Sequence, residues 1–306
     1  MHRLRNRTIV IRRKMHVDEL DVDQSLVRRL VTGQFPQWAD LPLEPIPSAG
    51  TDNALYRLGD DMVVRLPRIH WAVGAVENEH RWLPKLAPLL PVAIPVPLAN
   101  GISAEDYPWP WCVYSWIEGE NPTIGGITEV DSLIADLVRF VRALHRIDLP
   151  DGAPSHRGAP LEVQDEEARS ALAELEGMIN TDAATAVWNE ALTAPDWSGA
   201  AVWIHGDLLL GNLLVRRGRL TGVIDWAALG IGDPACDMIV AWALLPPAAR
   251  DTFRVSLCVD DATWARGRGW ALSIALIQLP YYKDTNPTLA AIARHTIAEV
   301  LADHEA

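Results

Sequence analysis

The sequence predicts an α+β fold with two lobes, a small β-rich N-terminal lobe and a larger, mainly helical C-terminal lobe. Two short apolar runs at 55–58 and 62–66 flank a Gly-Asp-Asp turn, and this pattern predicts a β-hairpin. After Gly119 the apolar residues recur three or four positions apart, which is typical of amphipathic helices. The change of pattern places a short connector near 115–120.

The N-terminal lobe is expected to span 15–118. An amphipathic pattern predicts a helix at 15–33, before a β region at 41–68 that contains the hairpin. A second predicted helix at 72–88 ends in a proline-rich stretch, because proline cannot continue a helix. The apolar run 111–114 predicts the last strand of this lobe.

The C-terminal lobe is expected to span 119–306. It begins with a predicted helix at 131–147, and Thr128 and Asp131 have the spacing of a capping box. Further along the chain we expect a loop at 150–165, helices at 166–193 and 235–300, and a β segment at 201–226 between the helices.

Composition excludes several classes of protein. The 306 residues carry a net charge of −13, and six of the 27 basic residues lie in 1–14, which we expect to be a disordered basic leader. The rest has 21 bases against 40 acids, which disfavours a nucleic-acid partner because phosphate contacts need Lys and Arg.

The mostly apolar runs stop at about ten residues, whereas a membrane-spanning helix needs roughly 20. Three widely spaced cysteines without a CxxC pair favour a reducing cytoplasm: Cys112, Cys236 and Cys258.

Two carboxylates and one amide are predicted to converge within 203–226. Asp207 and Asn212 lie five positions apart on a predicted loop, and a hairpin over 213–224 would return Asp225 to the side of Asn212. One carboxylate can orient an attacking hydroxyl and accept its proton. The other carboxylate and the amide oxygen can hold Mg²⁺ on nucleotide phosphates. This set of groups suits phosphoryl transfer.

The chain resembles the aminoglycoside phosphotransferases and related small-molecule kinases over most of residues 40–300. The motifs that carry the resemblance are His205-Gly206-Asp207, Asn212, Ile224-Asp225 and Gly232-Asp233-Pro234 with Asp237. The resemblance implies a protein-kinase-like fold. It also implies that Asp207 is the catalytic base and that Asn212 and Asp225 are ligands of Mg²⁺.

The resemblance further implies nucleotide-binding groups in the N-terminal lobe. Arg65 stands where the family places a phosphate-contacting Lys or Arg, and Glu79, in preference to Glu77, would pair with it. The loop over the phosphates would include Gly50, Thr51 and Asn53, and the Ser115 carbonyl and Ile117 amide would bond the adenine. The sequence leaves open whether the nucleotide is ATP or GTP.

Three residues near the motif are expected to be structural. His205 is expected to brace the loop of Asp207, since a His followed by Gly is usually a satisfied structural residue. Asp233 before Pro234 has the pattern of a helix N-cap. Asp237 is expected to bond the backbone of the same loop.

The acceptor class stays open at this level. Acidic residues could line a cleft for a polycationic aminoglycoside, whereas aromatic side chains could form walls for a macrolide, a nucleoside or a cyclic peptide antibiotic. The acidic candidates are Glu118, Glu120, Asp165, Glu166, Glu167, Glu174 and Glu176, and the aromatic candidates are Trp242, Trp264, Trp270, Tyr281 and Tyr282.

We therefore expect Mg²⁺-dependent transfer of the γ-phosphate of ATP or GTP to a hydroxyl of a small molecule, foremost an antibiotic, in a cytoplasmic monomer or homodimer. The alternatives are a metabolic kinase for choline, a homoserine-like compound or a sugar, and a nucleotide-binding relative without catalysis. A protein kinase is disfavoured, because the chain lacks a GxGxxG loop and only eight positions separate Asp225 from Asp233.

Overall fold

The computed structural model describes residues 19–47, 50 and 52–305. The predicted basic leader 1–14 and Thr51 lie outside these residues. The N-terminal lobe contains a five-stranded antiparallel sheet in the order β1-β2-β3-β5-β4. Its strands are β1 (Leu43–Pro45), β2 (Asn53–Leu58), β3 (Met62–Pro67), β4 (Pro97–Gly101) and β5 (Trp111–Ser115). The predicted hairpin is confirmed as β2 and β3.

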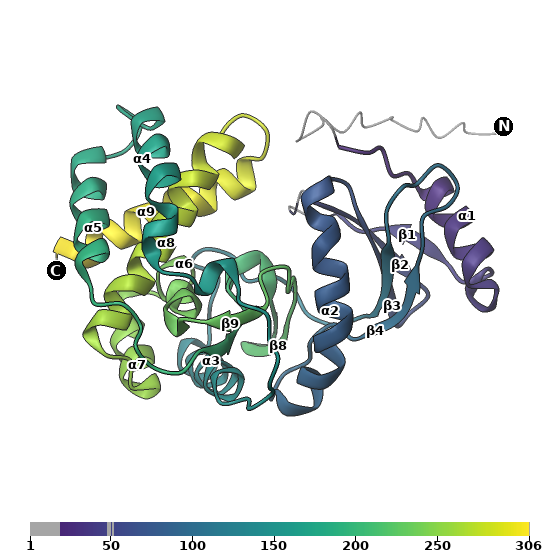
Figure 1. The fold of residues 1–306 in the computed structure, drawn as a ribbon, viewed down its shortest axis with the longest axis horizontal. Helices are drawn as coiled ribbons and strands as arrows, with labels where there is room; N and C mark the ends of the chain where they lie inside the picture. The colour runs from purple at the N-terminus through teal and green to yellow at the C-terminus, as the bar shows by residue number, and fades with distance from the viewer. Residues whose placement is uncertain (1–18, 48–49, 51, 306) are drawn as a thin grey trace.

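Helices cover both faces of this sheet (Figure 1). Helix α1 (Gln24–Gln34) packs on the outer face with Trp111 and Val113, and helix α2 (Val73–Leu86) packs on the inner face with Cys112 and Tyr114. The alternation along β5 explains why its run of apolar residues is buried on both sides. Strand β4, which begins with Pro97, lies at the sheet edge, where the missing N–H of proline costs no ladder hydrogen bond.

The C-terminal lobe is mainly helical. Its helices are α3 (Val130–His145), α4 (Asp165–Glu174), α5 (Thr181–Thr193), α6 (Val240–Ala243), α7 (Pro247–Leu257), α8 (Asp261–Tyr282) and α9 (Pro287–Glu305). Two small antiparallel pairs lie between α5 and α6: β6 (Val202–Ile204) with β9 (Gly230–Gly232), and β7 (Leu213–Arg216) with β8 (Arg219–Val223). The β segment predicted at 201–226 is confirmed as β6, β7 and β8.

Several predicted helix bounds are wrong. The first helix begins at Gln24, because the Asp23 side chain caps it by accepting a hydrogen bond from the Leu26 amide at 2.7 Å. Before the cap, the Leu20 amide instead donates to the carbonyl of Arg68, just after the end of β3, at 2.8 Å. The predicted capping box does not form, since α3 begins at Val130 with Glu129 as a cap that makes no side-chain hydrogen bond.

The longer predicted helices are interrupted. The segment 166–193 breaks between α4 and α5, where Gly177 adopts a φ of +74° that a continuous helix cannot contain. The segment 235–300 divides into four helices after a 3₁₀ turn (Pro234–Ile239). One break follows Leu244, before the pair Pro246-Pro247, and another lies at Cys258 with a φ of +59°.

The hydrophobic core runs across the two lobes. Val76, Trp82 and Leu83 of α2 pack in the same cluster as the helices of the C-terminal lobe. The Trp82 ring lies 4.7 Å from the ring of Trp203 on β6. Among the described residues, no helix combines the length and the hydropathy that a membrane crossing requires.

Candidate active site

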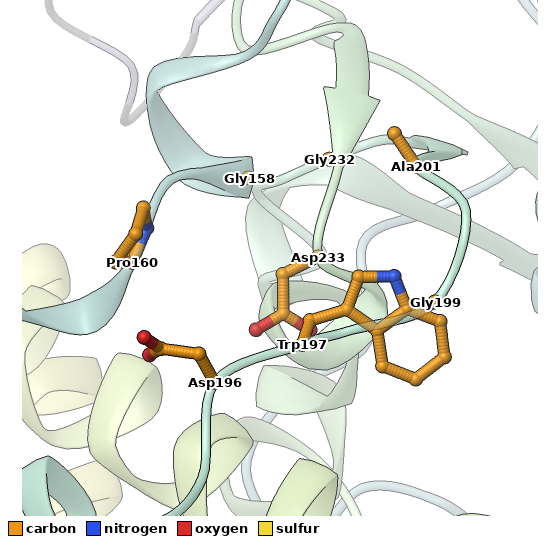
Figure 2. Close-up of a pocket in the computed structure, with 8 residues that line it drawn as sticks. All are labelled: Gly158, Pro160, Asp196, Trp197, Gly199, Ala201, Gly232 and Asp233. Atoms are coloured by element: carbon orange, nitrogen blue, oxygen red, sulfur yellow. The ribbon is translucent and has the colours of Figure 1, made fainter.

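A cavity of about 240 Å³ lies in the C-terminal lobe (Figure 2). Its lining residues are Gly158, Pro160, Asp196, Trp197, Gly199, Ala201, Gly232 and Asp233. None of the residues predicted to act on the nucleotide, the metal or the hydroxyl lines it. Asp233 acts as predicted for a structural residue: its carboxylate caps the Ala235 amide at 2.9 Å and pairs with Arg266 at 2.6 Å.

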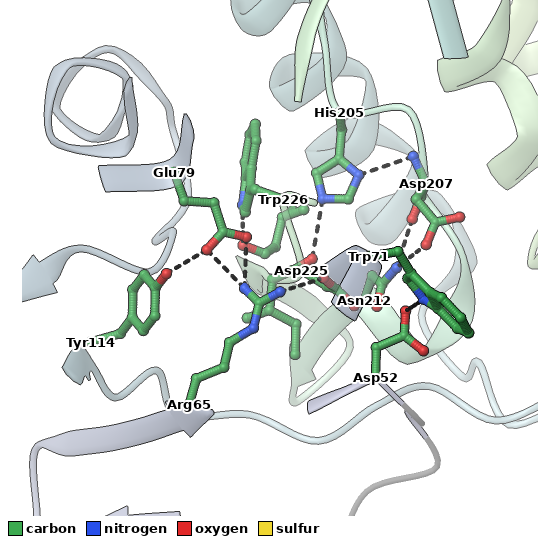
Figure 3. Close-up of polar contacts among 12 residues, drawn as sticks. Asp52, Arg65, Trp71, Glu79, Tyr114, His205, Asp207, Asn212, Asp225 and Trp226 are labelled. Atoms are coloured by element: carbon green, nitrogen blue, oxygen red, sulfur yellow. Dashed lines mark hydrogen bonds and ion pairs between the residues drawn. The ribbon is translucent and has the colours of Figure 1, made fainter. Parts of the chain in front are cut away.

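The residues predicted for catalysis and metal binding lie together, just after the C-terminal end of β6 (Figure 3). Asp207 follows β6, Asn212 ends the next turn, and the β7–β8 hairpin returns the chain to Asp225. The Ile224 amide donates to the Asn212 carbonyl at 2.8 Å, so the hairpin places Asp225 next to Asn212. The structure thus brings the three side chains into one site, as the spacing predicts.

Asp207 and Asn212 are joined directly. The Asn212 Nδ2 donates to Asp207 Oδ2 at 2.7 Å and to the Asp207 carbonyl at 2.9 Å. Burial raises the pKa of the Asp207 carboxyl, the nearby charge of Asp225 raises it further, and the charge of Arg157 opposes the rise. The other side-chain atom, Asn212 Oδ1, has no hydrogen-bond partner among the described residues.

Asp225 is the more open carboxylate, with 45% of its side chain exposed. Its backbone has a φ of +60°, a left-handed conformation that Asp tolerates better than most residues. A carboxylate and an amide oxygen are ligands that Mg²⁺ accepts. The free Oδ1 of Asn212 and the open carboxylate of Asp225 therefore fit a magnesium ion. No group of three or more His, Cys, Asp or Glu side chains suited to a metal occurs among the described residues.

The N-terminal lobe contributes a buried ion pair. Arg65 Nη1 donates to both carboxylate oxygens of Glu79, at 2.6 and 2.8 Å, and the Tyr114 hydroxyl donates to Glu79 Oε2 at 2.5 Å. Glu79 is buried, whereas Glu77 is exposed, so the predicted preference for Glu79 is confirmed. Arg65 Nη2 also reaches Asp225 Oδ1 at 3.4 Å. Burial alone would lower the pKa of Arg65, but Glu79 and Asp225 raise it above its usual value.

Hydrogen bonds to the side chains of Asp237 and His205 hold the loop of Asp207 in place. Asp237 accepts hydrogen bonds from the amides of Gly206 at 2.8 Å and His205 at 3.2 Å, as predicted, and also contacts His145 Nε2 at 2.9 Å. His205 Nδ1 accepts from the Asp207 amide at 3.2 Å, so its Nε2 carries the proton and donates to the Ile224 carbonyl at 3.1 Å. His205 is fully buried, which agrees with the predicted bracing role.

The contacts of the predicted nucleotide loop and of the connector are described only in part. Asn53 begins β2, and its Oδ1 is buried without a hydrogen-bond partner among the described residues. Gly50 is described, but Thr51 is not. Ser115 ends β5, and the Ile117 amide of the connector donates to no residue that the structure describes. An adenine contact by the Ser115 carbonyl and this amide stays a prediction.

Sequence reasoning missed three residues of the site. Tyr114 bonds Glu79, Asn121 bonds the chain around Asn212, and Arg157 packs against Gly206, the residue before Asp207. In the sequence, Tyr114 appears only as one residue of the strand predicted at 111–114. Asn121 and Arg157 lie in segments without a regular pattern, so only the tertiary structure brings them to the site.

Many of the acceptor-binding candidates have structural contacts of their own. Trp242, Trp264 and Trp270 are buried in the core, whereas Tyr281 is half exposed. Asp165 accepts from the Trp188 indole at 2.8 Å and pairs with Arg169, and Glu118 accepts from the Trp116 indole at 2.8 Å. The other acidic candidates, Glu120, Glu166, Glu167, Glu174 and Glu176, are exposed.

Comparisons with known proteins agree with this geometry. A sequence model of the phosphotransferase enzyme family matches residues 43–270. An uncharacterized protein of Bacillus subtilis (strain 168), YcbJ, is 34% identical over 76 residues, a match that spans only 24% of this chain and 23% of YcbJ.

Solved structures share the fold at low sequence identity. The GDP and kanamycin complex of APH(2")-IIIa has a TM-score of 0.73 at 18% identity, covering 90% of this chain and 98% of that one. The macrolide 2'-phosphotransferase MphH from Brachybacterium faecium has a TM-score of 0.56 at 24% identity, covering 85% and 93%. These likenesses establish the α+β, protein-kinase-like fold with its two lobes.

Proposed function

The chain belongs to the phosphotransferase enzyme family, and from this premise we propose that it transfers the γ-phosphate of ATP or GTP to a hydroxyl of a small molecule with the help of Mg²⁺. The observation that carries the proposal is the convergence of Asp207, Asn212 and Asp225 beside the Arg65–Glu79 pair. This set supplies a base, two oxygen ligands for a metal, and a cation for phosphate oxygens.

Each group has a defined task in this reaction. Asp207 accepts the proton of the acceptor hydroxyl, whose oxygen forms the new bond to the γ-phosphorus. The bond between that phosphorus and the oxygen bridging to the β-phosphate breaks, and the nucleoside diphosphate leaves. Arg65, held in place by Glu79, stabilises the phosphate charge. Asn212 and Asp225 would hold Mg²⁺, which neutralises charge on the phosphate oxygens when bound.

The nucleotide is proposed to lie between the lobes. Gly50, Thr51 and Asn53 would cover its phosphates, and the Ser115 carbonyl and Ile117 amide would bond its base. The unpartnered amide of Ile117 and the unpartnered Oδ1 of Asn53 support these positions. We propose that the enzyme acts in the cytoplasm as a monomer or homodimer, with lobes at 15–118 and 119–306.

A hydroxyl-bearing antibiotic is the proposed acceptor class. The proteins that share the fold include one solved with kanamycin and others named as macrolide 2'-phosphotransferases, which supports this choice. A second candidate is a metabolic alcohol. It is favoured by the contacts of Asp165 and Glu118, which are already engaged within the protein instead of lining a cleft for a polycation.

An acceptor screen tests the proposal. The purified chain is incubated with Mg²⁺, ATP or GTP, and a panel of aminoglycosides, macrolides and simple metabolic alcohols. We expect one acceptor class to stimulate release of nucleoside diphosphate, to gain a phosphoryl group by mass spectrometry, and to lose both signals with excess EDTA. Binding of the nucleotide without any turnover across the panel would instead favour a non-catalytic relative.

A further inference from the structure

The connector between the lobes carries a cluster of three side chains that the proposed transfer step does not use. They are Arg57 of β2 and two connector residues, Trp116 and Glu118. The guanidinium carbon of Arg57 lies 3.8 Å from the centre of the Trp116 ring, and Arg57 Nη2 lies 3.4 Å from Glu118 Oε1. The Trp116 indole N–H donates to the same Glu118 oxygen at 2.8 Å. Each of the three side chains therefore contacts the other two.

The same arginine joins the connector to the turn of the β2–β3 hairpin. Arg57 Nε donates to the Gly59 carbonyl at 3.2 Å, and Arg57 Nη2 donates to the Asp60 carbonyl. The Trp116 amide donates to the Asp61 carbonyl of this turn at 2.7 Å. Because the guanidinium carries several donors in one rigid plane, Arg57 can hold the turn and the connector at the same time. The start of the connector is thus fixed to the N-terminal lobe.

The end of the connector is fixed to the C-terminal lobe. The Thr221 hydroxyl of β8 donates to the Glu118 carbonyl at 2.9 Å. Gly119 has a φ of +154°, and a Cβ there would lie 2.7 Å from Thr221 Oγ1, so the chain can pass this close only with glycine. Glu120 and Val215 of β7 exchange two backbone hydrogen bonds, at 2.8 and 3.0 Å.

Ile117 lies between these two points of attachment. Its side chain packs on β8, since a Cβ on Gly222 would lie 2.6 Å from Ile117 Cγ2. Its amide donates to none of the residues that the structure describes. The connector therefore offers one donor in a fixed position. A donor that needs no reordering when its ligand binds contributes more to affinity than a mobile one.

We propose that Arg57 is a positioning residue for the nucleotide base, and that it acts through Trp116 and Glu118 to hold the Ile117 amide where the base accepts its hydrogen bond. Arg57 touches no part of the nucleotide itself. The proposal rests on the proposed function and deepens it, because it concerns affinity for the base and leaves the transfer step unchanged. It also assigns Glu118 to the connector instead of the acceptor cleft.

Calorimetric titration with a nucleoside diphosphate tests the proposal without any need for turnover. The dissociation constant of ADP or GDP, whichever the wild type binds more tightly, is measured with Mg²⁺ for the wild type, Arg57→Gln, Arg57→Lys and Arg29→Gln. Arg29 is a matched control, because it forms an ion pair with Glu105 in the same lobe at 3.1 Å and contacts no connector residue. We expect binding about tenfold weaker in Arg57→Gln and unchanged in Arg29→Gln. Arg57→Lys should restore part of the affinity, since it keeps a cation near the Trp116 ring.

Tripolyphosphate distinguishes a role at the base from a general distortion of the site. It has no base, so we expect the wild type and Arg57→Gln to bind it equally, as measured by displacement of bound nucleotide. In turnover, Arg57→Gln should raise KM for the nucleotide about tenfold and leave kcat and KM for the acceptor unchanged. A substitution that merely loosened the fold would change all of these constants.

Variants of Trp116 test the route of the effect. If Arg57 acts through this ring, Trp116→Ala weakens nucleotide binding about as much as Arg57→Gln, and the double variant binds no more weakly than either single variant. Trp116→Phe keeps an aromatic ring under Arg57 and loses only the indole N–H to Glu118, so its effect should be smaller.

Three results would overturn the proposal. The first is an equal dissociation constant for the nucleotide in the wild type and Arg57→Gln, with both proteins folded by circular dichroism. The second is an equal loss of affinity for nucleotide and tripolyphosphate, and the third is full additivity of the Arg57 and Trp116 substitutions. Nucleotide binding that depends on Arg57, in a chain that phosphorylates no acceptor, would contradict only the proposed function. A wild type that binds no nucleotide would contradict both.

Discussion

At the scale of single residues, the environment of Asp207 determines its titration. Burial raises the pKa of its carboxyl, and the charge of Asp225 adds to the rise, against the effect of Arg157. A catalytic base must be ionised, so activity is lost as the pH falls through this raised pKa. We predict that the acid limb of kcat/KM lies above about 3.9, the ordinary value for Asp. A pH–rate profile with its acid limb at or below that value would contradict the prediction.

The raised pKa of Asp207 also affects the stability of the folded protein. Because the folded state binds the Asp207 proton more tightly than the unfolded state, the stability contributed by this group falls as the pH rises from the unfolded pKa through the folded pKa. At pH values above that range, the ionised Asp207 carboxylate lowers the free energy of unfolding by a constant amount. We predict that Asp207→Asn has a Tm at pH 7 equal to or above that of the wild type. A clearly lower Tm, measured by calorimetry, would show that the charge stabilises the fold.

Sequence reasoning succeeded for residues whose roles depend on local spacing. Asp207, Asn212 and Asp225 lie within twenty positions on one loop and one hairpin, so their convergence could be predicted from turn signals alone. The pair of Arg65 with Glu79 followed from the family resemblance, and the structure confirms the contact. Arg157 could not be predicted, because a tertiary contact with Gly206 places it at the site.

At the scale of elements, the turn around Asn212 depends on Asn121, which follows the connector. Its Nδ2 donates to the carbonyls of Gly211 at 2.8 Å and Leu213 at 2.9 Å, on either side of Asn212. We predict that Asn121→Ala lowers the free energy of unfolding by only about 1 kcal/mol, since water can replace part of these bonds. It should lower kcat by about 10- to 100-fold, because the turn shifts.

The matched control is Asn189→Ala on the exposed face of α5, which we expect to leave kcat unchanged. Denaturant unfolding and steady-state kinetics measure the two effects for both variants. Wild-type kcat in Asn121→Ala would show that the turn holds Asn212 without the side chain of Asn121.

The elements themselves were predicted unevenly, for physical reasons. The β2–β3 and β7–β8 hairpins were found because short apolar runs flank turn residues. Helix ends were missed where tertiary contacts decide them. The segment before Asp23 looks amphipathic, yet the Leu20 amide donates to the Arg68 carbonyl just after β3, and the Tyr56 hydroxyl donates to the Val22 carbonyl.

At the scale of the whole molecule, one core joins the two lobes. Trp82 of α2 packs on Trp203, which lies just before the loop of Asp207, and Asn78 of α2 donates to the Leu229 carbonyl at 2.9 Å. The lobe that supplies Arg65 and the lobe that supplies Asp207 are therefore not independent. Their relative position follows from a shared interior, which no local pattern of sequence reveals.

We predict from this packing that Trp82→Ala destabilises both lobes together. The loss of a buried Trp should lower the free energy of unfolding by about 3–5 kcal/mol. Scanning calorimetry should show a single transition at lower temperature. Trp71 is 60% exposed and offers a matched control, and Trp71→Ala should shift Tm far less. Two separate transitions in Trp82→Ala, with one lobe unchanged, would contradict a shared core.

The central claim, that Asp207 acts as the base of a phosphoryl transfer, is tested most directly by following labelled γ-phosphate into the acceptor found in the screen. The measurement compares the wild type, Asp207→Asn and the exposed control Asp196→Asn at saturating nucleotide. The account predicts transfer at the wild-type rate in Asp196→Asn and a rate lowered about 10²- to 10⁴-fold in Asp207→Asn, with nucleotide affinity retained. Transfer by Asp207→Asn at the wild-type rate would contradict it.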